Sequence, residues 1–208
     1  MKRIGLVQFQ APFSEQSYLP LSVGMLWATL KESNLAQEMV LVGMLHNRSE
    51  FQQGLVTFKG VDILGVSIYT WNEQISLEFI SKCKAANPNV KVIVGGPQIP
   101  DDGISYLQKH KSIDICIHGE GEETFREILA SLVLNDCEIQ VDVLNSIEGS
   151  TISYLKGNER LYAKSNRRKR LANFTLASPF LDGTFDSLLR NSPRQKWMAL
   201  WETNRGCP

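Results

Sequence analysis

The sequence predicts an α/β protein with a doubly wound, flavodoxin-like sheet. Five parallel strands are expected in the order 2-1-3-4-5, with a C-terminal hairpin and linker extension. Three observations predict this fold. Short apolar segments alternate with amphipathic helical segments up to about residue 140. The segments Val61–Tyr69 and Val90–Val94 are almost wholly apolar, as in strands that helices cover on both faces. After residue 140 the alternation stops and a hairpin pattern follows.

Each expected strand is followed by a helix. The strands are Lys2–Phe9, Met39–Leu45, Val61–Tyr69, Val90–Val94 and Ile113–Ile117. The helices, with apolar residues at helical spacing, are Ser22–Glu32, Phe51–Phe58, Ile75–Ala86, Ile104–His110 and Glu122–Leu134. Because crossovers between parallel strands are right-handed, the carboxyl ends of the strands meet at one edge of the sheet. Open α/β sheets bind their ligands at that edge.

The region after residue 140 has a different pattern. Thr151–Leu155 and Arg160–Lys164 flank Gly157-Asn158, which indicates a hairpin with its turn at those two residues. Ser178-Pro179 and Leu188–Pro193 indicate a linker, and Lys196–Trp201 begins a new strand.

Composition limits the partners. The formal net charge is zero, no apolar run approaches the roughly 18 residues of a membrane-spanning helix, and no signal peptide is present. We therefore expect a soluble cytoplasmic protein without nucleic-acid or membrane partners. The basic run Arg167–Arg170 lacks interleaved aromatic residues and is interpreted as a solvated linker face. Cys83 and Cys116 lie in a predicted helix and a predicted strand and are expected to be buried thiols.

Three loops reach the carboxyl edge of the predicted sheet. Ser67-Ile-Tyr-Thr-Trp-Asn72 offers a hydroxyl, two aromatics and an amide. Gly95-Gly-Pro97 and His118-Gly-Glu-Gly-Glu122 bring bare backbone to the same edge. Together they predict a broad pocket for a large, mostly neutral ligand that carries many amide groups.

Each loop also has a purely structural interpretation. Gly-Gly-Pro alone can be a tight turn, and Trp71 can cap the edge of the core. The carboxylates of Glu122 and Glu123 can simply stabilise the N-terminus of a helix through its macrodipole. For His118 a satisfied structural histidine is favoured over a ligand.

Several ligand classes are excluded by missing motifs. The segment after the first strand, Gln8-Phe-Gln-Ala-Pro-Phe13, contains no Gly-x-Gly-x-x-Gly, and no Walker loop exists in the chain. The first and third strands end without the acidic cluster of a phospho-acceptor domain. A hydroxyl-rich loop for a flavin phosphate is also missing.

Four segments together resemble one known family, the cobalamin-binding radical SAM enzymes. They are Trp71-Asn72, Ile93-Val-Gly-Gly-Pro97, Gly119-Glu-Gly-Glu-Glu-Thr-Phe125 and Glu202-Thr-Asn-Arg-Gly-Cys-Pro208. The resemblance covers almost the whole chain. It implies a cobalamin-binding domain over residues 1–140, a hairpin and linker over 141–195, and the start of a truncated radical SAM barrel over 196–208.

The resemblance also implies cofactors and site residues. Cobalamin is expected to bind at Tyr18, Pro20, Ser67, Tyr69, Trp71, Asn72, Gly95, Gly96, Pro97, Gly119, Glu120, Gly121 and Glu122. Cys207 resembles the first cysteine of the Cys-x-x-x-Cys-x-x-Cys motif that holds a [4Fe–4S] cluster, on which S-adenosylmethionine gives a radical. A methyltransferase is favoured for the intact parent, while some relatives rearrange or cyclise substrates. With one of three thiolates and the barrel missing, this chain alone should lack radical chemistry.

The sequence departs from the cobalamin family at one motif. Many cobalamin domains carry Asp-x-His-x-x-Gly, whose histidine ligates cobalt, and no histidine here has an aspartate two residues before it. We therefore expect cobalamin with its own base detached and no histidine on cobalt, the lower face meeting loop residues near Ser67–Asn72 or water. Two other classes stay open: a flavodoxin-like regulatory domain without a cofactor, and a flavin-binding domain.

Overall fold

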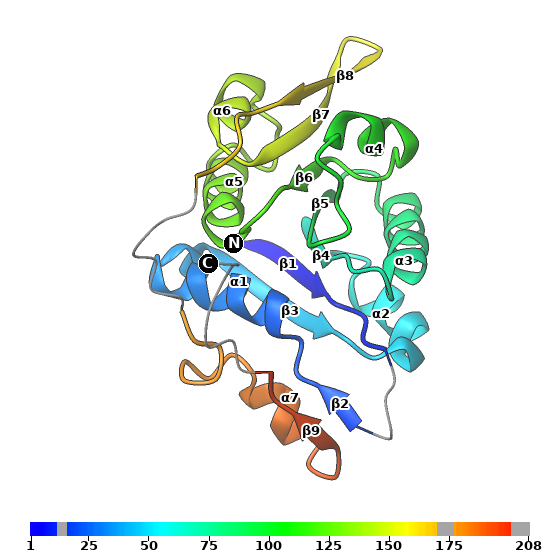
Figure 1. The fold of residues 1–208 in the computed structure, drawn as a ribbon, viewed down its shortest axis with the longest axis vertical. Coiled ribbons are helices and arrows are strands. Elements are labelled where there is room, and N and C mark those ends of the chain that lie inside the picture. The colour runs from blue at the N-terminus through cyan, green and yellow to red at the C-terminus, as the bar shows by residue number, and fades with distance from the viewer. Residues whose placement is uncertain (12–15, 170–176, 201–208) are drawn as a thin grey trace.

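A seven-stranded sheet forms the centre of the computed structural model, which describes residues 1–11, 16–169 and 177–200 (Figure 1). The strand order is β3-β1-β4-β5-β6-β7-β8. The parallel part consists of β1 (Lys2–Val7), β3 (Met39–Leu45), β4 (Ile63–Ser67), β5 (Lys91–Gly95) and β6 (Ile115–Ile117). These are the five expected strands, and their order 2-1-3-4-5 is confirmed.

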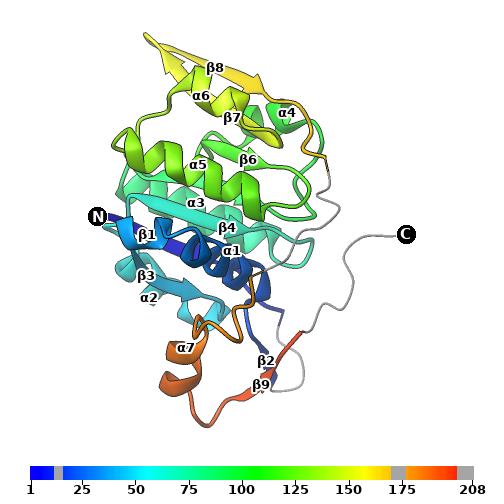
Figure 2. The ribbon, with the colours of Figure 1, turned by 90° about the vertical axis from the view of Figure 1, so that its left-hand side faces the viewer.

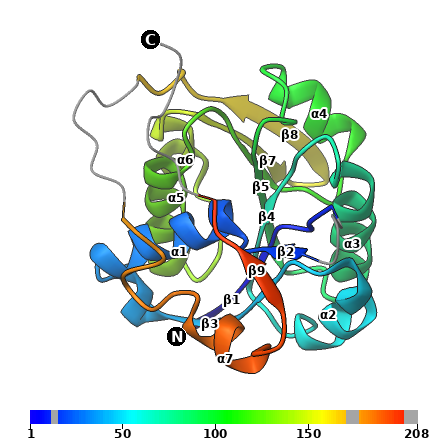
Figure 3. The ribbon, with the colours of Figure 1, turned by 60° about the horizontal axis from the view of Figure 1, so that its bottom comes forward.

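Helices cover both faces of the sheet (Figure 3). One face carries α1 (Leu21–Glu32), α5 (Glu122–Leu134) and α6 (Val141–Ser146), and the other carries α2 (Phe51–Thr57), α3 (Glu73–Ala86) and α4 (Gly103–Lys109). Short 3₁₀ turns, η1 (Leu35–Glu38) and η2 (Arg48–Glu50), flank β3. Each face has its own apolar core, one around Phe125 and Trp27 and the other around Phe79 and Phe58. This division follows from apolar strands that bury both pleat faces.

The hairpin was expected as a separate extension, and it instead belongs to the main sheet. Strands β7 (Ser150–Lys156) and β8 (Glu159–Lys164) turn at Gly157 and Asn158, as predicted, with Gly157 at φ +63°. Strand β7 pairs antiparallel with β6, which makes seven strands in place of five. The pairing covers the edge of β6, which would otherwise expose unpaired backbone groups.

Two helices and one strand pairing differ from expectation. Helix α6 was not predicted, and α7 (Asp186–Asn191) occupies part of a segment that was expected to be linker. Strand β9 (Lys196–Met198) begins where predicted, and it pairs in parallel with β2 (Gln16–Tyr18) in a second, two-stranded sheet that lies apart from the main sheet (Figure 2). That pairing joins segments from opposite ends of the chain, which no local pattern signals.

Gln8, at the end of β1, fixes the start of α1. Its Oε1 accepts hydrogen bonds from the backbone N–H groups of Ser22 (3.0 Å) and Val23 (3.4 Å). Helix α1 has no side-chain cap from its own preceding residue, Pro20, so the buried Gln8 amide serves as a remote cap. The first turn of α1, with Ser22, is thereby held at the carboxyl edge of the sheet.

Two smaller expectations concern the cysteines and membranes. Cys83 and Cys116 are buried free thiols, as predicted, and burial raises the pKa of each to about 12. In the described part of the chain, no helix has the length and apolar character needed to cross a bilayer.

Candidate functional site

A cavity of about 910 Å³ opens at the carboxyl ends of β4, β5 and β6. Its size falls within the usual range of ligand pockets. It extends over the sheet between α1 and α5, because Ser22 and Leu26 of α1 and Phe125 of α5 line it together with strand residues Gly65 and Ile93. The remaining lining residues are Val66, Ser67, Tyr69, Gly95, Gly96, Pro97, Ile99, Asp101, Ile117, His118, Gly119, Glu120, Gly121, Glu122, Glu123, Arg167, Arg168 and Lys169.

Gly95 and Gly96 leave the end of β5 without side chains, for two different reasons. Gly96 has φ +111°, and a Cβ there would lie 2.4 Å from the carbonyl oxygen of Ile68, so the chain itself requires glycine. Gly95 lies in the strand, and a Cβ there would meet only Ile117, at 3.6 Å. The fold therefore has room for a Cβ atom at Gly95, and its absence leaves free space at the cavity wall.

The loop from His118 to Glu122 forms the next part of the wall. Gly119, at φ +72°, and Gly121, before the first turn of α5, both line the cavity, so this part of the wall again lacks side chains. The Nε2 of His118 is hydrogen-bonded to Thr151 Oγ1 at 2.8 Å, and its Nδ1 is buried. Burial lowers the pKa of His118, which favours the neutral imidazole. The paired Nε2 agrees with the interpretation of His118 as a satisfied structural histidine, but the buried Nδ1 has no hydrogen-bond partner among the described residues.

Asn72 fixes the loop after β4 and does not line the cavity. Its side chain is fully buried, its Oδ1 accepts from the Tyr69 N–H at 2.8 Å, and its Nδ2 donates to the carbonyls of Phe9 (2.9 Å) and Ser67 (3.1 Å). These bonds hold Tyr69 at the cavity, where its hydroxyl is hydrogen-bonded to Ser22 Oγ. Asn72 is therefore a positioning residue for Tyr69.

Trp71 lies outside the cavity as well. Its ring stacks on Tyr69, with the centroids 4.5 Å apart and the planes 16° apart, and 53% of the residue is exposed. Such exposure does not fit the interpretation that Trp71 caps the core. The stacking holds the Tyr69 ring from its outer side.

The structure brings most of the predicted binding residues together. Ser67, Tyr69, Gly95, Gly96, Pro97, Gly119, Glu120, Gly121 and Glu122 line one cavity. Tyr18 in β2, buried Pro20 before α1, Trp71 and Asn72 do not line it. Cys207 lies outside the described residues.

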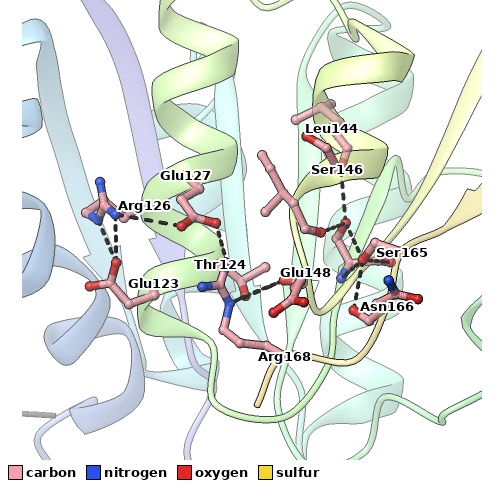
Figure 4. A network of polar contacts seen from close by, with 12 residues as sticks. Glu123, Thr124, Arg126, Glu127, Leu144, Ser146, Glu148, Ser165, Asn166 and Arg168 are labelled. Carbon is pink, nitrogen blue, oxygen red and sulfur yellow. Dashed lines mark hydrogen bonds and ion pairs between the residues drawn. The ribbon is translucent and has the colours of Figure 1, made fainter. Parts of the chain in front are cut away.

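The basic run Arg167–Arg170 was expected to be a solvated linker face, and among its described residues Arg167 and Lys169 are exposed as expected, whereas Arg168 is half-buried. Arg167, Arg168 and Lys169 line the cavity. Arg168 is anchored on α5 and the loop before β7: its Nε donates to Thr124 Oγ1 (2.8 Å) and to the Glu148 carbonyl (3.3 Å), and its Nη2 pairs with Glu127 (Figure 4). No sequence pattern indicated that the basic run lies at the cavity, because the run is brought there only by the pairing of β7 with β6.

Comparison with known proteins decides the family. A model of the B12 binding domain matches residues 14–129, more than half of the chain. The chain belongs to the B12-binding domain family. The expected cobalamin-binding domain is thus confirmed, and the flavin and cofactor-free alternatives gain no support. Its predicted boundary near residue 140 stays a prediction.

Curated relatives of this B12-binding domain are longer enzymes. It is similar to the cobalamin-dependent radical SAM methyltransferase TokK of Streptomyces tokunonensis, with 31% identity over 205 residues, 94% of this chain and 28% of the relative. It is also similar to the 2-(S-pantetheinyl)-carbapenam-3-carboxylate methyltransferase of Streptantibioticus cattleyicolor, with 30% identity over 151 residues, 71% of this chain and 21% of the relative. The chain thus spans about a quarter of the length of these relatives.

A solved structure shows the same fold. The cobalamin-dependent S-adenosylmethionine radical enzyme OxsB, with aqua-cobalamin and S-adenosylmethionine bound, superposes with a TM-score of 0.58. The match has 17% sequence identity and covers 81% of this chain and 23% of the OxsB chain. OxsB with aqua-cobalamin alone gives a TM-score of 0.57.

Proposed function

We propose that this chain is the cobalamin-binding module of a larger radical SAM methyltransferase, and that its cavity holds the cofactor. The observation that carries the proposal is Gly95. A Cβ atom at Gly95 would meet only an ordinary contact, yet none is present, at the carboxyl edge where this class of sheet binds ligands. Membership of the B12-binding domain family and the relatives TokK and OxsB support the same assignment.

The parts of the cavity fit the parts of cobalamin. Gly95–Pro97 and Gly119–Gly121 present backbone to a flat corrin ring, and Glu120 and Ser67 offer polar groups to its amide side chains. The space between α1 and α5 is lined by Leu26, Ile93 and Phe125, and it suits the apolar base of the nucleotide tail once that base has left the cobalt. When bound, cobalamin supplies a metal centre that carries a methyl group.

The proposal also includes a radical SAM barrel with its [4Fe–4S] cluster in the parent enzyme. Strand β9 begins the segment assigned to the radical SAM barrel, and Cys207 is proposed as the first thiolate of the [4Fe–4S] cluster. Two more cysteines, four and seven positions after Cys207, are expected in the coding sequence that follows. Methyl transfer to a carbon radical formed with S-adenosylmethionine would be the activity of that whole enzyme.

Titration with hydroxocobalamin tests the proposed function. The visible bands of hydroxocobalamin are expected to shift on binding, and the cofactor should elute with the protein in gel filtration. Flavin mononucleotide serves as the matched control and should remain in the free fraction. Retention of the flavin with no shift of the corrinoid bands would overturn the proposal in favour of a flavin-binding domain.

No histidine is expected to ligate the cobalt. The chain has three histidines, His46, His110 and His118. His46 is buried beside Trp197, His110 packs on Tyr106, and His118 lines the cavity but holds Thr151 with its Nε2. Cobalt(II) EPR of the bound cofactor should therefore show no nitrogen hyperfine splitting. Splitting that disappears in a His118→Ala variant would identify His118 as the ligand and contradict this expectation.

A further inference from the structure

Arg167–Lys169, here called the basic strap, lies at the cavity although it comes long after the loops that form the rest of the wall. The hairpin brings it there. The Gly149 N–H donates to the Asn166 carbonyl at 2.7 Å, and the Ser150 N–H donates to Ser165 Oγ at 2.9 Å. The chain is thus fixed beside β7 up to the first residue of the strap.

Arg168 then fixes the middle of the strap. Its guanidinium is bound by Glu127, Thr124 and the Glu148 carbonyl, and only 18% of its side chain is accessible (Figure 4). Its charge is therefore balanced inside the protein by Glu127. Arg168 therefore anchors the strap to the protein, and this holds its neighbours Arg167 and Lys169 at the cavity.

Arg167 and Lys169 are the cations that remain. Both are exposed and line the cavity, and neither forms an ion pair with another described residue. The carboxylates on the cavity wall are Asp101, Glu120, Glu122 and Glu123, and Glu123 is paired with Arg126 at 2.7 Å. An anionic group in this cavity is therefore attracted by the cations of the strap and repelled by the carboxylates of the wall.

Cobalamin has one anionic group at its periphery, the phosphodiester that links the corrin to the nucleotide. We infer that Arg167 and Lys169 bind this phosphodiester, and that the strap selects complete cobalamin over corrinoids that lack the nucleotide. Arginine and lysine are the side chains that bind phosphate most strongly, arginine in a two-pronged geometry. The inference rests on the proposed function, because it concerns the same cofactor in the same cavity.

Binding of two corrinoids, hydroxocobalamin and cobinamide, to the full 208-residue chain tests whether the strap binds the phosphodiester. Cobinamide has the corrin ring and its amides but neither phosphodiester nor base. In the double variant Arg167→Gln/Lys169→Gln, the Kd for hydroxocobalamin is expected to rise about tenfold, while the Kd for cobinamide stays within about twofold. Added salt should weaken hydroxocobalamin binding more in the unmodified protein than in the variant.

The matched control is Lys59→Gln/Lys111→Gln, which removes two exposed cations that do not line the cavity and should leave both Kd values unchanged. Equal weakening of both corrinoids by the strap variant, or no weakening of either, overturns the inference while the proposed function stands. If the unmodified chain binds neither corrinoid, the proposed function itself fails. The two failures are therefore distinguishable.

Discussion

Replacing Gly95 with valine is expected to weaken cobalamin binding at least about 100-fold, which corresponds to a steric cost of about 3 kcal/mol. The two branched methyl groups would occupy the space at the end of β5 where we place the corrin ring. The fold itself should survive, because a Cβ at this position meets Ile117 at an ordinary 3.6 Å and valine suits a strand. Hydroxocobalamin titration measures the binding, and thermal unfolding measured without cofactor checks the fold.

Gly95→Ala is the graded control and should weaken binding less than valine does, because it adds one methyl group. Gly96→Val is not an equivalent probe. Its Cβ would lie 2.4 Å from the Ile68 carbonyl oxygen at φ +111°, so we expect loss of the fold itself. Normal cobalamin binding by a folded Gly95→Val variant would place the cofactor elsewhere.

Replacing Asp114 with alanine is expected to lower the free energy of unfolding by about 3–5 kcal/mol. Asp114 is 7% exposed, and its Oδ2 accepts from Lys84 Nζ at 2.7 Å and from the Val92 N–H at 2.8 Å. Removal of the carboxylate leaves the Lys84 ammonium with only the Val90 carbonyl and leaves a buried backbone donor unpaired. Denaturant unfolding measures the loss as a shift of the midpoint with an unchanged slope.

Asp114→Asn separates the two contributions of Asp114. Its amide oxygen still accepts from Val92, so this variant should lose less stability than alanine does. Asp114 immediately precedes β6 and lies at the edge of the sheet opposite the cavity, so the folded fraction of either variant should bind cobalamin as the unmodified protein does. A loss below about 1 kcal/mol in Asp114→Ala would show that the pair behaves as an exposed salt bridge.

The parallel part of the sheet could be predicted because its information is local. Apolar strands such as Ile63–Ser67 and helices such as Glu122–Leu134 appear as short periodic patterns, and right-handed crossovers then fix the strand order. The pairing of β7 with β6 could not be predicted in this way. An alternating hairpin has the same sequence pattern whether it stands alone or extends a sheet, because the pattern shows which face is buried and not which strand is the neighbour.

For the binding residues, too, the loop could be predicted from the sequence, but the position of each side chain relative to the cavity could not. Loop position alone placed Ser67 and Trp71 in one group, and only the packing showed that Ser67 lines the cavity while Trp71 stacks on the outside of Tyr69. The positions of Arg167 and Lys169 at the cavity could not be predicted, because the hairpin that carries them had no known partner strand.

The residue pattern was enough to predict the parallel core and the bare backbone at Gly95 and Gly96, because a missing side chain is a covalent property that holds in any conformation. The folded chain was needed to show that a Cβ atom fits at Gly95 but not at Gly96, and that the basic strap lines the same cavity. Both depend on contacts between residues that are distant in the chain, namely Ile68 with Gly96 and β6 with β7. Such contacts are set by packing in three dimensions, and no local pattern of residues encodes them.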